Sequence, residues 1–250
     1  EALKEYEDIC RTAGVVRTKL AATAVLRDPS NAAYVCSRIA ESTSFKPEII
    51  SGEDEARFVY RAGTRSFPFP ENKVVIDIGG GSVEFVTGNS KEIFLKKSLS
   101  IGAVKMTDRF IKTFPVGQSE LDALKNHLRE TYVRELSGFF AYKPEQFIGV
   151  AGTFTTAAAM FQSMHDYDPA KITGYQLKKD DVTSLLAKVS KMSIEEQKGL
   201  PGLHPKRAGY IVTGLVLVES FYQFFNIDSI TVSDEGLRYG VLIDWIEQGI

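Results

Sequence analysis

Three consecutive glycines interrupt two apolar runs in the segment Val74–Val86, which reads VVIDIGGGSVEFV. The run Val74–Ile76 before them is continuously apolar, as is typical of a strand that is buried on both faces. After the glycines, apolar and polar residues alternate, which predicts a second strand with one face toward the core. The segment therefore predicts a strand, a tight turn and a second strand. This order excludes the Rossmann glycine loop, which must open a helix, and the Walker loop, which needs a following Gly-Lys-Ser/Thr.

The glycine turn and its flanking acids allow two interpretations. Glycine permits positive φ angles and lets a ligand approach the backbone closely, and successive N–H groups in a tight turn form an anion-binding nest. Asp77, the acid at the end of the incoming strand, could then hold a hydrated Mg²⁺ beside the phosphate, because this ion is usually bound through one or two carboxylates plus phosphate oxygens. The alternative is a mobile hairpin whose acids face water. Three glycines cost folding entropy that a two-residue turn avoids, and this favours the phosphate interpretation slightly.

The rest of the chain alternates between strand-like and helix-like segments, which predicts an α/β fold. The segment 65–73, RSFPFPENK, has two prolines and no periodicity, and is therefore a predicted loop and domain boundary. Short strands are predicted at Lys19–Ala24 and Glu48–Ile50, and long helices at Ser119–Phe140 and Pro205–Phe225.

Composition and charge limit the class of protein. A chain of 250 residues with 44% hydrophobic and 25% charged residues is typical of a soluble globular protein, and a net charge of −2 gives no global basic field for nucleic acid or a membrane surface. No apolar stretch approaches the roughly 20 residues of a membrane span, and no signal peptide is recognisable. A cytoplasmic location is therefore expected. Because the chain starts without Met inside a helix-like pattern, EALKEYEDIC, its true start is expected to be missing.

Three acidic residues open the helix predicted for the segment SGEDEARFVY, with Ser51 as its N-cap. Acids in a first helical turn interact favourably with the helix dipole, which is a sufficient explanation for Glu53 and Asp54. Glu55 lies deeper, with apolar residues three and four positions further on, so it is expected against partly buried surface. A carboxylate in such a place is a candidate general base.

Two further features are candidates for phosphate binding. Gly152 and Thr153 stand between a predicted strand and an alanine-rich helix, where a helix N-terminus can accept phosphate. A simple glycine turn with a threonine cap is the equal alternative. Arg27 and Arg207 precede or open helices, so each is a candidate phosphate ligand, although a solvated surface arginine explains either residue alone.

Taken in order, these segments resemble the exopolyphosphatase/guanosine pentaphosphate phosphohydrolase family, which belongs to the superfamily of actin-like ATPases, sugar kinases and Hsp70. The resemblance runs from about Lys19 to Trp245, and the SGEDEA motif is the part that distinguishes the phosphohydrolases within the superfamily. The segments that carry it are ATAVLRDPSN, IISGEDEARFVY, VVIDIGGGSVEFV, LSIGAVKMTDRF, VAGTFTTAAA, PKRAGYIVTG and VSDEGLRYG.

The resemblance implies two ribonuclease-H-like α/β domains that flank a cleft. Residues 1–72 would form the first domain, which is N-terminally incomplete because the family's opening strand and its Asp-Leu-Gly-Ser-Asn-Ser loop are missing here. Residues 73–250 would form the second domain, whose last helix can pack back on the first. The chain resembles the short, two-domain type of the family, and since a dimer is common in the family, a homodimer is a possible state. The segment GLRYG departs from the family's Arg-Glu-Gly, which puts the role of that turn in doubt.

The resemblance also implies a reaction and a set of roles. The activity would be Mg²⁺-dependent release of terminal orthophosphate from inorganic polyphosphate or from guanosine pentaphosphate, which leaves guanosine tetraphosphate. Glu55 would activate the attacking water, and Asp77 with Glu84 would bind Mg²⁺. The phosphates would be held by Gly79, Gly80, Gly81, Ser82, Arg27, Gly152, Thr153 and Arg207. The alternatives are a phosphotransferase or ATPase of the same superfamily and a non-enzymatic phosphate or nucleotide sensor.

Overall fold

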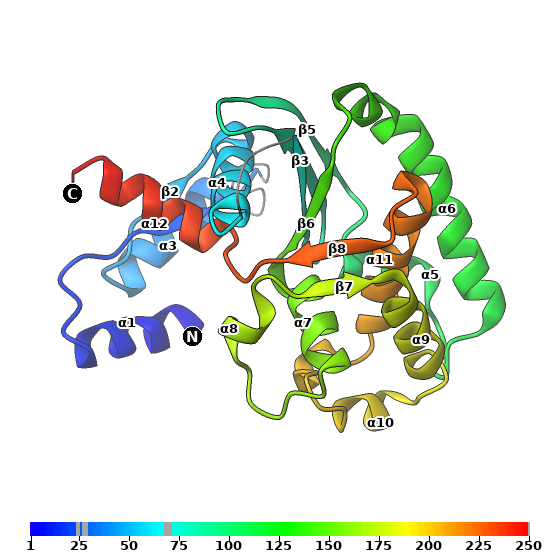
Figure 1. Ribbon diagram of the computed structural model, residues 1–250. Helices are drawn as coiled ribbons and strands as arrows, with labels where there is room; N and C mark the ends of the chain where they lie inside the picture. The colour runs from blue at the N-terminus through cyan, green and yellow to red at the C-terminus, as the bar shows by residue number, and fades with distance from the viewer. Residues whose placement is uncertain (24–25, 27–29, 68–71, 250) are drawn as a thin grey trace. The chain divides into compact units, whose positions relative to one another are not determined.

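The computed structural model describes residues 1–23, 26, 30–67 and 72–249 of the chain (Figure 1). The chain divides into two compact units, Glu1–Arg57 and Phe58–Ile250. The division falls inside helix α4 (Gly52–Thr64), so one continuous helix begins in the first unit and ends in the second. The sequence-based domain boundary between residues 72 and 73 stays a prediction.

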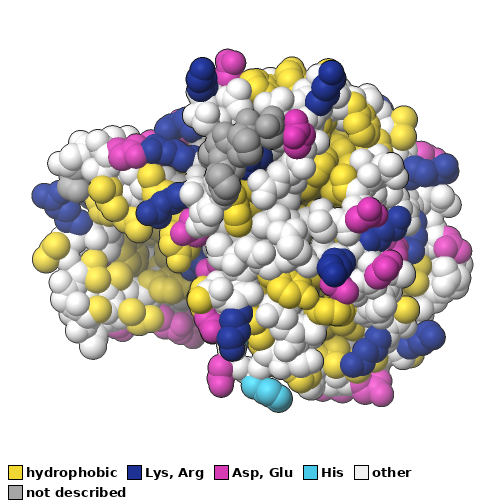
Figure 2. Space-filling model, in the orientation of Figure 1, with side chains coloured by type: hydrophobic (Ala, Val, Ile, Leu, Met, Phe, Trp, Pro, Cys, Tyr) yellow, Lys and Arg dark blue, Asp and Glu magenta, His cyan; other side chains and the backbone are white. Residues whose placement is uncertain are grey.

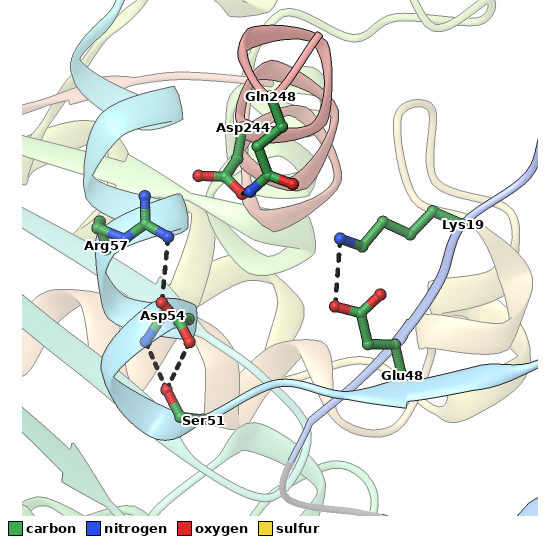
Figure 3. Close-up of polar contacts among 7 residues, drawn as sticks. All are labelled: Lys19, Glu48, Ser51, Asp54, Arg57, Asp244 and Gln248. Atoms are coloured by element: carbon green, nitrogen blue, oxygen red, sulfur yellow. Dashed lines mark hydrogen bonds and ion pairs between the residues drawn. The ribbon is translucent and has the colours of Figure 1, made fainter. Parts of the chain in front are cut away.

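The first unit is built on two short parallel strands. Its elements are α1 (Ala2–Thr12), β1 (Leu20–Ala22), α3 (Ala32–Ser42), β2 (Pro47–Ile49) and the first turns of α4. Leu20 pairs with Pro47, which confirms a strand in each of the two segments where the sequence predicts one. The Lys19 ammonium, directly before β1, lies 3.3 Å from the carboxylate of Glu48 in β2 (Figure 3).

The second unit is organised around a six-stranded sheet with the strand order β5-β4-β3-β6-β8-β7. Its strands are β3 (Lys73–Ile78), β4 (Val83–Gly88), β5 (Ile93–Leu99), β6 (Gln146–Val150), β7 (Gln176–Lys178) and β8 (Ser229–Val232). Strands β3, β4 and β5 form an antiparallel meander, whereas β6 lies parallel to β3 and β8 lies parallel to β6. This is the arrangement expected of a ribonuclease-H-like domain, and it confirms the predicted α/β class. Strand β7 pairs antiparallel with β8 at the edge.

Helices cover both faces of this sheet, which explains the continuous apolar run in β3. Val74 and Ile76 point to one face and join the main core, and Figure 1 shows α6 and α11 beside the sheet. Val75 points to the other face, where Gly63 of α4 approaches the side chains of Val75 and Val150. The helices of this unit, besides the end of α4, are α5 (Ala103–Phe110), α6 (Gln118–Leu136), the 3-10 helix η1 (Ser137–Tyr142), α7 (Ala151–Phe161), α8 (Pro169–Ile172), α9 (Lys179–Val189), α10 (Ile194–Lys198), the 3-10 turn η2 (Pro205–Arg207), α11 (Ile211–Phe225) and α12 (Leu237–Glu247).

Helix α11 is the central helix of the core and is buried along nearly its whole length. Its one acid, Glu219, lies 2.5 Å from the Lys125 ammonium of α6 and accepts a 3.1 Å hydrogen bond from Thr183 of α9. A buried charge without such partners would be strongly destabilising. Among the residues that the structure describes, no helix combines the length and the apolar character that crossing a membrane requires.

The long helix predicted from Pro205 to Phe225 is wrong at its start. Residues Pro205–Arg207 form only the 3-10 turn η2, and α11 begins at Ile211. The break lies at Gly209, whose φ of +88° is in the left-handed region that favours glycine. The N–H of Gly209 donates instead to the Gln197 side chain at 2.9 Å.

Tyr132 of α6 provides a test of the core that is independent of function. Its ring is fully buried against Phe85 and Phe221, with ring centroids 6.3 and 5.1 Å away, and burial raises the pKa of its hydroxyl. Within the described part of the chain this hydroxyl has no hydrogen-bond partner. Because Tyr132→Phe removes an unsatisfied buried group, it is expected to raise the free energy of unfolding in urea by about 1 kcal/mol.

Tyr222→Phe is the matched control for this measurement. The Tyr222 hydroxyl is also buried, but it donates to the Leu177 carbonyl at 2.6 Å. Its removal leaves that acceptor unpaired and is expected to lower the free energy of unfolding by about 1 kcal/mol. Equal losses in the two variants would show that the Tyr132 hydroxyl is satisfied as well.

Candidate functional site

The glycine hairpin joins β3 to β4, as the sequence predicts, and is fixed through its carbonyl groups. Within the hairpin the Gly79 N–H donates to the Ser82 carbonyl at 2.9 Å. The other bonds run from the start of α5: Gly102 N–H to the Gly81 carbonyl at 3.1 Å, Ala103 N–H to Gly79 at 3.0 Å and Lys105 N–H to Gly80 at 3.0 Å. The first N–H groups of a helix normally lack partners, and here the hairpin supplies them.

The three glycines of the hairpin do not adopt left-handed backbone angles, so this possible reason for glycine does not apply. A side chain at Gly81 would meet no atom of the chain within 4 Å, and one at Gly80 would only touch Val104 at ordinary contact distance. Gly102 differs, because a side chain there would collide with the backbone of Gly80 and Gly81. The fold therefore requires glycine at 102, whereas at 80 and 81 it leaves open space above the backbone.

Three adjacent N–H groups of the hairpin are available to a ligand. The N–H groups of Gly80, Gly81 and Ser82 have no acceptor among the described residues, and Gly80 and Gly81 are exposed. With the carbonyl groups bonded to α5, the hairpin is left as a row of donors. Such a row of N–H groups can bind an anion.

Two acids and a serine lie side by side on one face of the sheet next to the hairpin. Asp77 of β3 is paired with Glu84 of β4, and Glu84 is paired with Ser98 of β5. Directly opposed residues of antiparallel strands point to the same face, with Cβ atoms about 4.5–5.5 Å apart. The Ser98 hydroxyl donates to Glu84 at 2.9 Å, and both acids are half-buried. Ser98 was not predicted, because its partner is 14 positions away in the sequence.

This acid pair suits Mg²⁺ better than it suits a cation whose ligands all come from the protein. Among the described residues no group of three or more His, Cys, Asp or Glu side chains converges on one point. Mg²⁺ is commonly bound through one or two carboxylates, with water and phosphate oxygens as its remaining ligands. Asp77 and Glu84 lie adjacent to the hairpin N–H groups that have no acceptor among the described residues, and they match that requirement.

The start of α7 brings together two of the predicted phosphate ligands. Gly152 lies directly under the Arg207 guanidinium, which a side chain at position 152 would overlap. The turn predicted between strand and helix is missing, because β6 passes straight into α7 at Ala151, with a left-handed φ of +65°. Thr153 is buried and its hydroxyl donates to the Ile78 carbonyl at 3.4 Å, so its side chain links α7 to the end of β3.

A cavity of about 570 Å³ adjoins Arg207. Its polar lining comprises Thr155, Thr156, His165, Tyr167, His204 and Arg207. The Tyr167 hydroxyl donates to Asp234, and burial together with this bond raises the pKa of Tyr167 to about 12. Tyr167 therefore stays protonated at neutral pH. The cavity was not predicted, because its residues come from two separate segments that carry no motif.

The start of α4 is organised by Ser51, as predicted (Figure 3). The Asp54 N–H donates to the Ser51 hydroxyl at 3.0 Å, that hydroxyl donates to the Asp54 carboxylate at 2.8 Å, and Arg57 donates to the same carboxylate at 3.1 Å. Ser51 thus caps the helix, and the Asp54 carboxylate is held by Ser51 and Arg57. Glu55 is half-buried, one position into the helix from Asp54, which confirms the expectation that it lies against partly buried surface.

The predicted site residues are distributed over both units. Glu55 lies in the first unit, whereas the hairpin, Asp77, Glu84 and the Gly152–Arg207 pair lie in the second. Arg27 lies outside the described residues, so its role stays a prediction.

Charged groups of both signs occupy the surface. Among the described residues on the face drawn in Figure 2, lysine and arginine side chains are interspersed with acidic ones. Within the second unit Arg61 pairs with Glu247, and Arg65 lies 3.9 Å from Glu235. Positive side chains are therefore mixed with negative ones on this face, which agrees with a net charge of −2 for the whole chain.

Comparisons with known proteins extend these observations. A sequence model of the Ppx/GppA phosphatase family matches residues 1–248. The chain is 32% identical to the bifunctional 3-dehydroquinate synthase/phosphatase of Fusobacterium nucleatum, over 99% of the chain and 38% of that protein. It is 28% identical to exopolyphosphatase 2 of Mycobacterium tuberculosis, over 97% of the chain and 79% of that protein. The chain thus spans well under half of the first relative.

A solved structure shows the same fold. An exopolyphosphatase from Cytophaga hutchinsonii superposes on the chain with a TM-score of 0.89 at 30% identity, over 99% of the chain and 80% of that structure. This likeness confirms the two-domain, actin-like α/β fold that the sequence resemblance implies.

Proposed function

This chain belongs to the Ppx/GppA phosphatase family, and on that premise we propose that it hydrolyses phosphoanhydride bonds and releases terminal orthophosphate from a linear phosphate chain. The single observation that carries the proposal is the glycine hairpin. Its three N–H groups that have no acceptor among the described residues, together with the open space at Gly81, suit a phosphate group that must approach the backbone closely.

A divalent metal fits beside this phosphate. Asp77 and Glu84 would hold Mg²⁺, and the Ser98 hydroxyl would keep the Glu84 carboxylate oriented. The ion would neutralise the charge that phosphate oxygens carry during transfer. The hairpin supplies the N–H groups, and the flanking strands β3 and β4 supply the two carboxylates. All of these groups therefore belong to one continuous segment of the chain.

Glu55 is the residue that we assign as general base. It would accept a proton from the water whose oxygen attacks the terminal phosphorus, while the bond from that phosphorus to the bridging oxygen breaks and the electron pair leaves with the shortened chain. The support for this role is the half-buried position of Glu55 in α4, together with the bonds from Ser51 and Arg57 that hold the neighbouring Asp54 carboxylate. Gly152 and Arg207 are proposed to contact further phosphates.

Inorganic polyphosphate is the first substrate to test. Two proteins similar to this chain are called exopolyphosphatases, and guanosine pentaphosphate presents the same terminal phosphoanhydride. A homodimer and a cytoplasmic location stay predictions from the sequence.

Orthophosphate release measures this function. Purified full-length protein with Mg²⁺ is expected to release orthophosphate from polyphosphate, from guanosine pentaphosphate or from both, and chelation of the metal is expected to stop the release. If neither substrate yields orthophosphate although tripolyphosphate binds, the protein is a phosphate sensor and the hydrolase proposal fails.

A further inference from the structure

The cavity of about 570 Å³ lies between one face of α7 and the segment that joins α10 to α11. Gly152, Thr156 and Ala159 are spaced i, i+4 and i+7, so they follow one another along that face of the helix. The segment contacts this face at two places: the Arg207 guanidinium lies on Gly152, and Gly202 lies against the backbone of Ala159. Thr156 is between these two contacts and lines the cavity.

The Thr156 hydroxyl is a polar group that the fold leaves without a partner. Thr156 is only 7% exposed, and no group among the described residues forms a hydrogen bond with its hydroxyl. A threonine inside a helix often bonds the carbonyl four positions earlier, and this bond to Gly152 is not made here. Helical side chains point toward the N-terminus of their helix, so this one points back toward Gly152 and the guanidinium on it. An unpaired hydroxyl costs stability, and such a cost is expected where a ligand supplies the partner.

Arg207 carries a positive charge that the protein itself does not neutralise. The residue is half-buried, and within the described part of the chain no carboxylate pairs with it and no group accepts a hydrogen bond from its side chain. The described lining of the cavity includes no aspartate or glutamate. The guanidinium also lies at the first turn of α7, where the helix dipole is positive. These charges together favour an anion in the cavity.

We propose that the Arg207 guanidinium and the Thr156 hydroxyl form an anion-binding subsite in this cavity, which takes a phosphate of the substrate chain. This inference rests on the proposed function and adds Thr156 to the residues assigned there. Side chains four positions apart on a helix have Cβ atoms about 5–6 Å apart. The guanidinium occupies the place that a Cβ atom of Gly152 would take, so it is about one helical turn from Thr156. One phosphate can accept from both groups, because two hydrogen bonds of roughly 2.8 Å each span such a gap.

Thr156→Val tests the proposal, because valine has nearly the shape of threonine and lacks the hydroxyl. The dissociation constant for long-chain polyphosphate, measured by calorimetry without Mg²⁺, is expected to rise by about tenfold, as for one lost hydrogen bond to a charged group. The KM is expected to rise with it, and kcat is expected to change less. The melting temperature is expected to stay equal or to rise, since an unpaired buried hydroxyl is removed. A purely structural role would not combine equal or higher stability with weaker binding.

Thr87→Val is the matched control for Thr156→Val. The Thr87 hydroxyl in β4 is also buried and has no hydrogen-bond partner among the described residues, but Thr87 does not line the cavity. This variant is expected to have an equal or higher melting temperature and to bind polyphosphate within about twofold of the parent. Thr156→Ser keeps the hydroxyl and is expected to bind more tightly than Thr156→Val.

The double variant of Thr156→Val with Arg207→Gln shows whether the two side chains share one ligand. Arg207→Gln alone is expected to weaken polyphosphate binding by about tenfold, because a charge-assisted contact is lost. If one phosphate contacts both groups, the two substitutions are coupled, and adding Thr156→Val to Arg207→Gln is expected to change the dissociation constant by less than about twofold. Two independent losses that multiply in the double variant would refute the shared subsite.

The outcomes separate this inference from the function on which it rests. If the parent hydrolyses polyphosphate and Thr156→Val keeps the parent's KM and affinity, the subsite is refuted and the hydrolase stands. If the parent releases no orthophosphate but binds polyphosphate about tenfold more tightly than Thr156→Val, the hydrolase fails and the subsite stands. A parent that does not bind polyphosphate overturns both.

Discussion

Glu55→Gln is expected to lower kcat for orthophosphate release by about 10²- to 10⁴-fold, which is the usual contribution of a positioned general base. The amide has nearly the shape of the carboxylate but cannot accept the proton of the attacking water. Because Glu55 is not assigned to the phosphates, the KM and the affinity for tripolyphosphate are expected to stay near the parent's values. Steady-state kinetics and calorimetric binding of tripolyphosphate give the two readouts.

Glu53→Gln is the matched control for Glu55. It removes the same charge from the same helical turn, but Glu53 is exposed and is explained by the helix dipole. Its kcat is expected to stay within about twofold of the parent's. Equal losses of kcat in the two variants would show that the charge of the helix start matters rather than a base at Glu55. An active Glu55→Gln variant would refute the assignment outright.

Gly81→Ala is expected to keep the protein folded while weakening its function. Alanine fits at this position, because the φ angle is not left-handed and no atom lies within 4 Å of the added methyl group. The free energy of unfolding is expected to stay equal or to rise by about 0.4–1 kcal/mol, since alanine restricts the unfolded chain. The methyl group occupies the space that a bound phosphate needs, so kcat/KM is expected to fall by about 10- to 100-fold, as for one lost hydrogen bond to a charged group.

Gly102→Ala should behave differently from Gly81→Ala. Its side chain would collide with the backbone of Gly80 and Gly81, so it is expected to lower the melting temperature and kcat/KM together. The contrast is the informative result. A Gly81→Ala variant with unchanged kcat/KM would show that the open space above the hairpin is not used by substrate.

Local chemistry explains why parts of the site could be predicted from the sequence. The change from a continuous apolar run to alternation around the glycines indicated β3, the hairpin and β4, and the antiparallel register then placed Asp77 opposite Glu84. The serine before three acids indicated the start of α4, and Ser51 does bond the Asp54 N–H. These features are encoded within a dozen adjacent residues.

The remaining features depend on contacts between distant segments. Gly102 is required by the backbone of Gly80, 22 positions earlier, so nothing near it in the sequence indicates the constraint. The long helix was predicted too early because the left-handed angle at Gly209 and its bond to Gln197 have no local signal.

The most direct test of the central claim is the behaviour of the hairpin amides in solution. Amide NMR spectra of the 27.7 kDa chain would be followed during titration with tripolyphosphate, with and without Mg²⁺. The resonances of Gly80, Gly81 and Ser82 are expected to shift saturably, with the same midpoint as calorimetric binding. The dissociation constant obtained from these shifts is expected to fall when Mg²⁺ is present. If these three amides stay unmoved at saturating tripolyphosphate while other resonances shift, the phosphate binds elsewhere and the assignment of the hairpin is wrong.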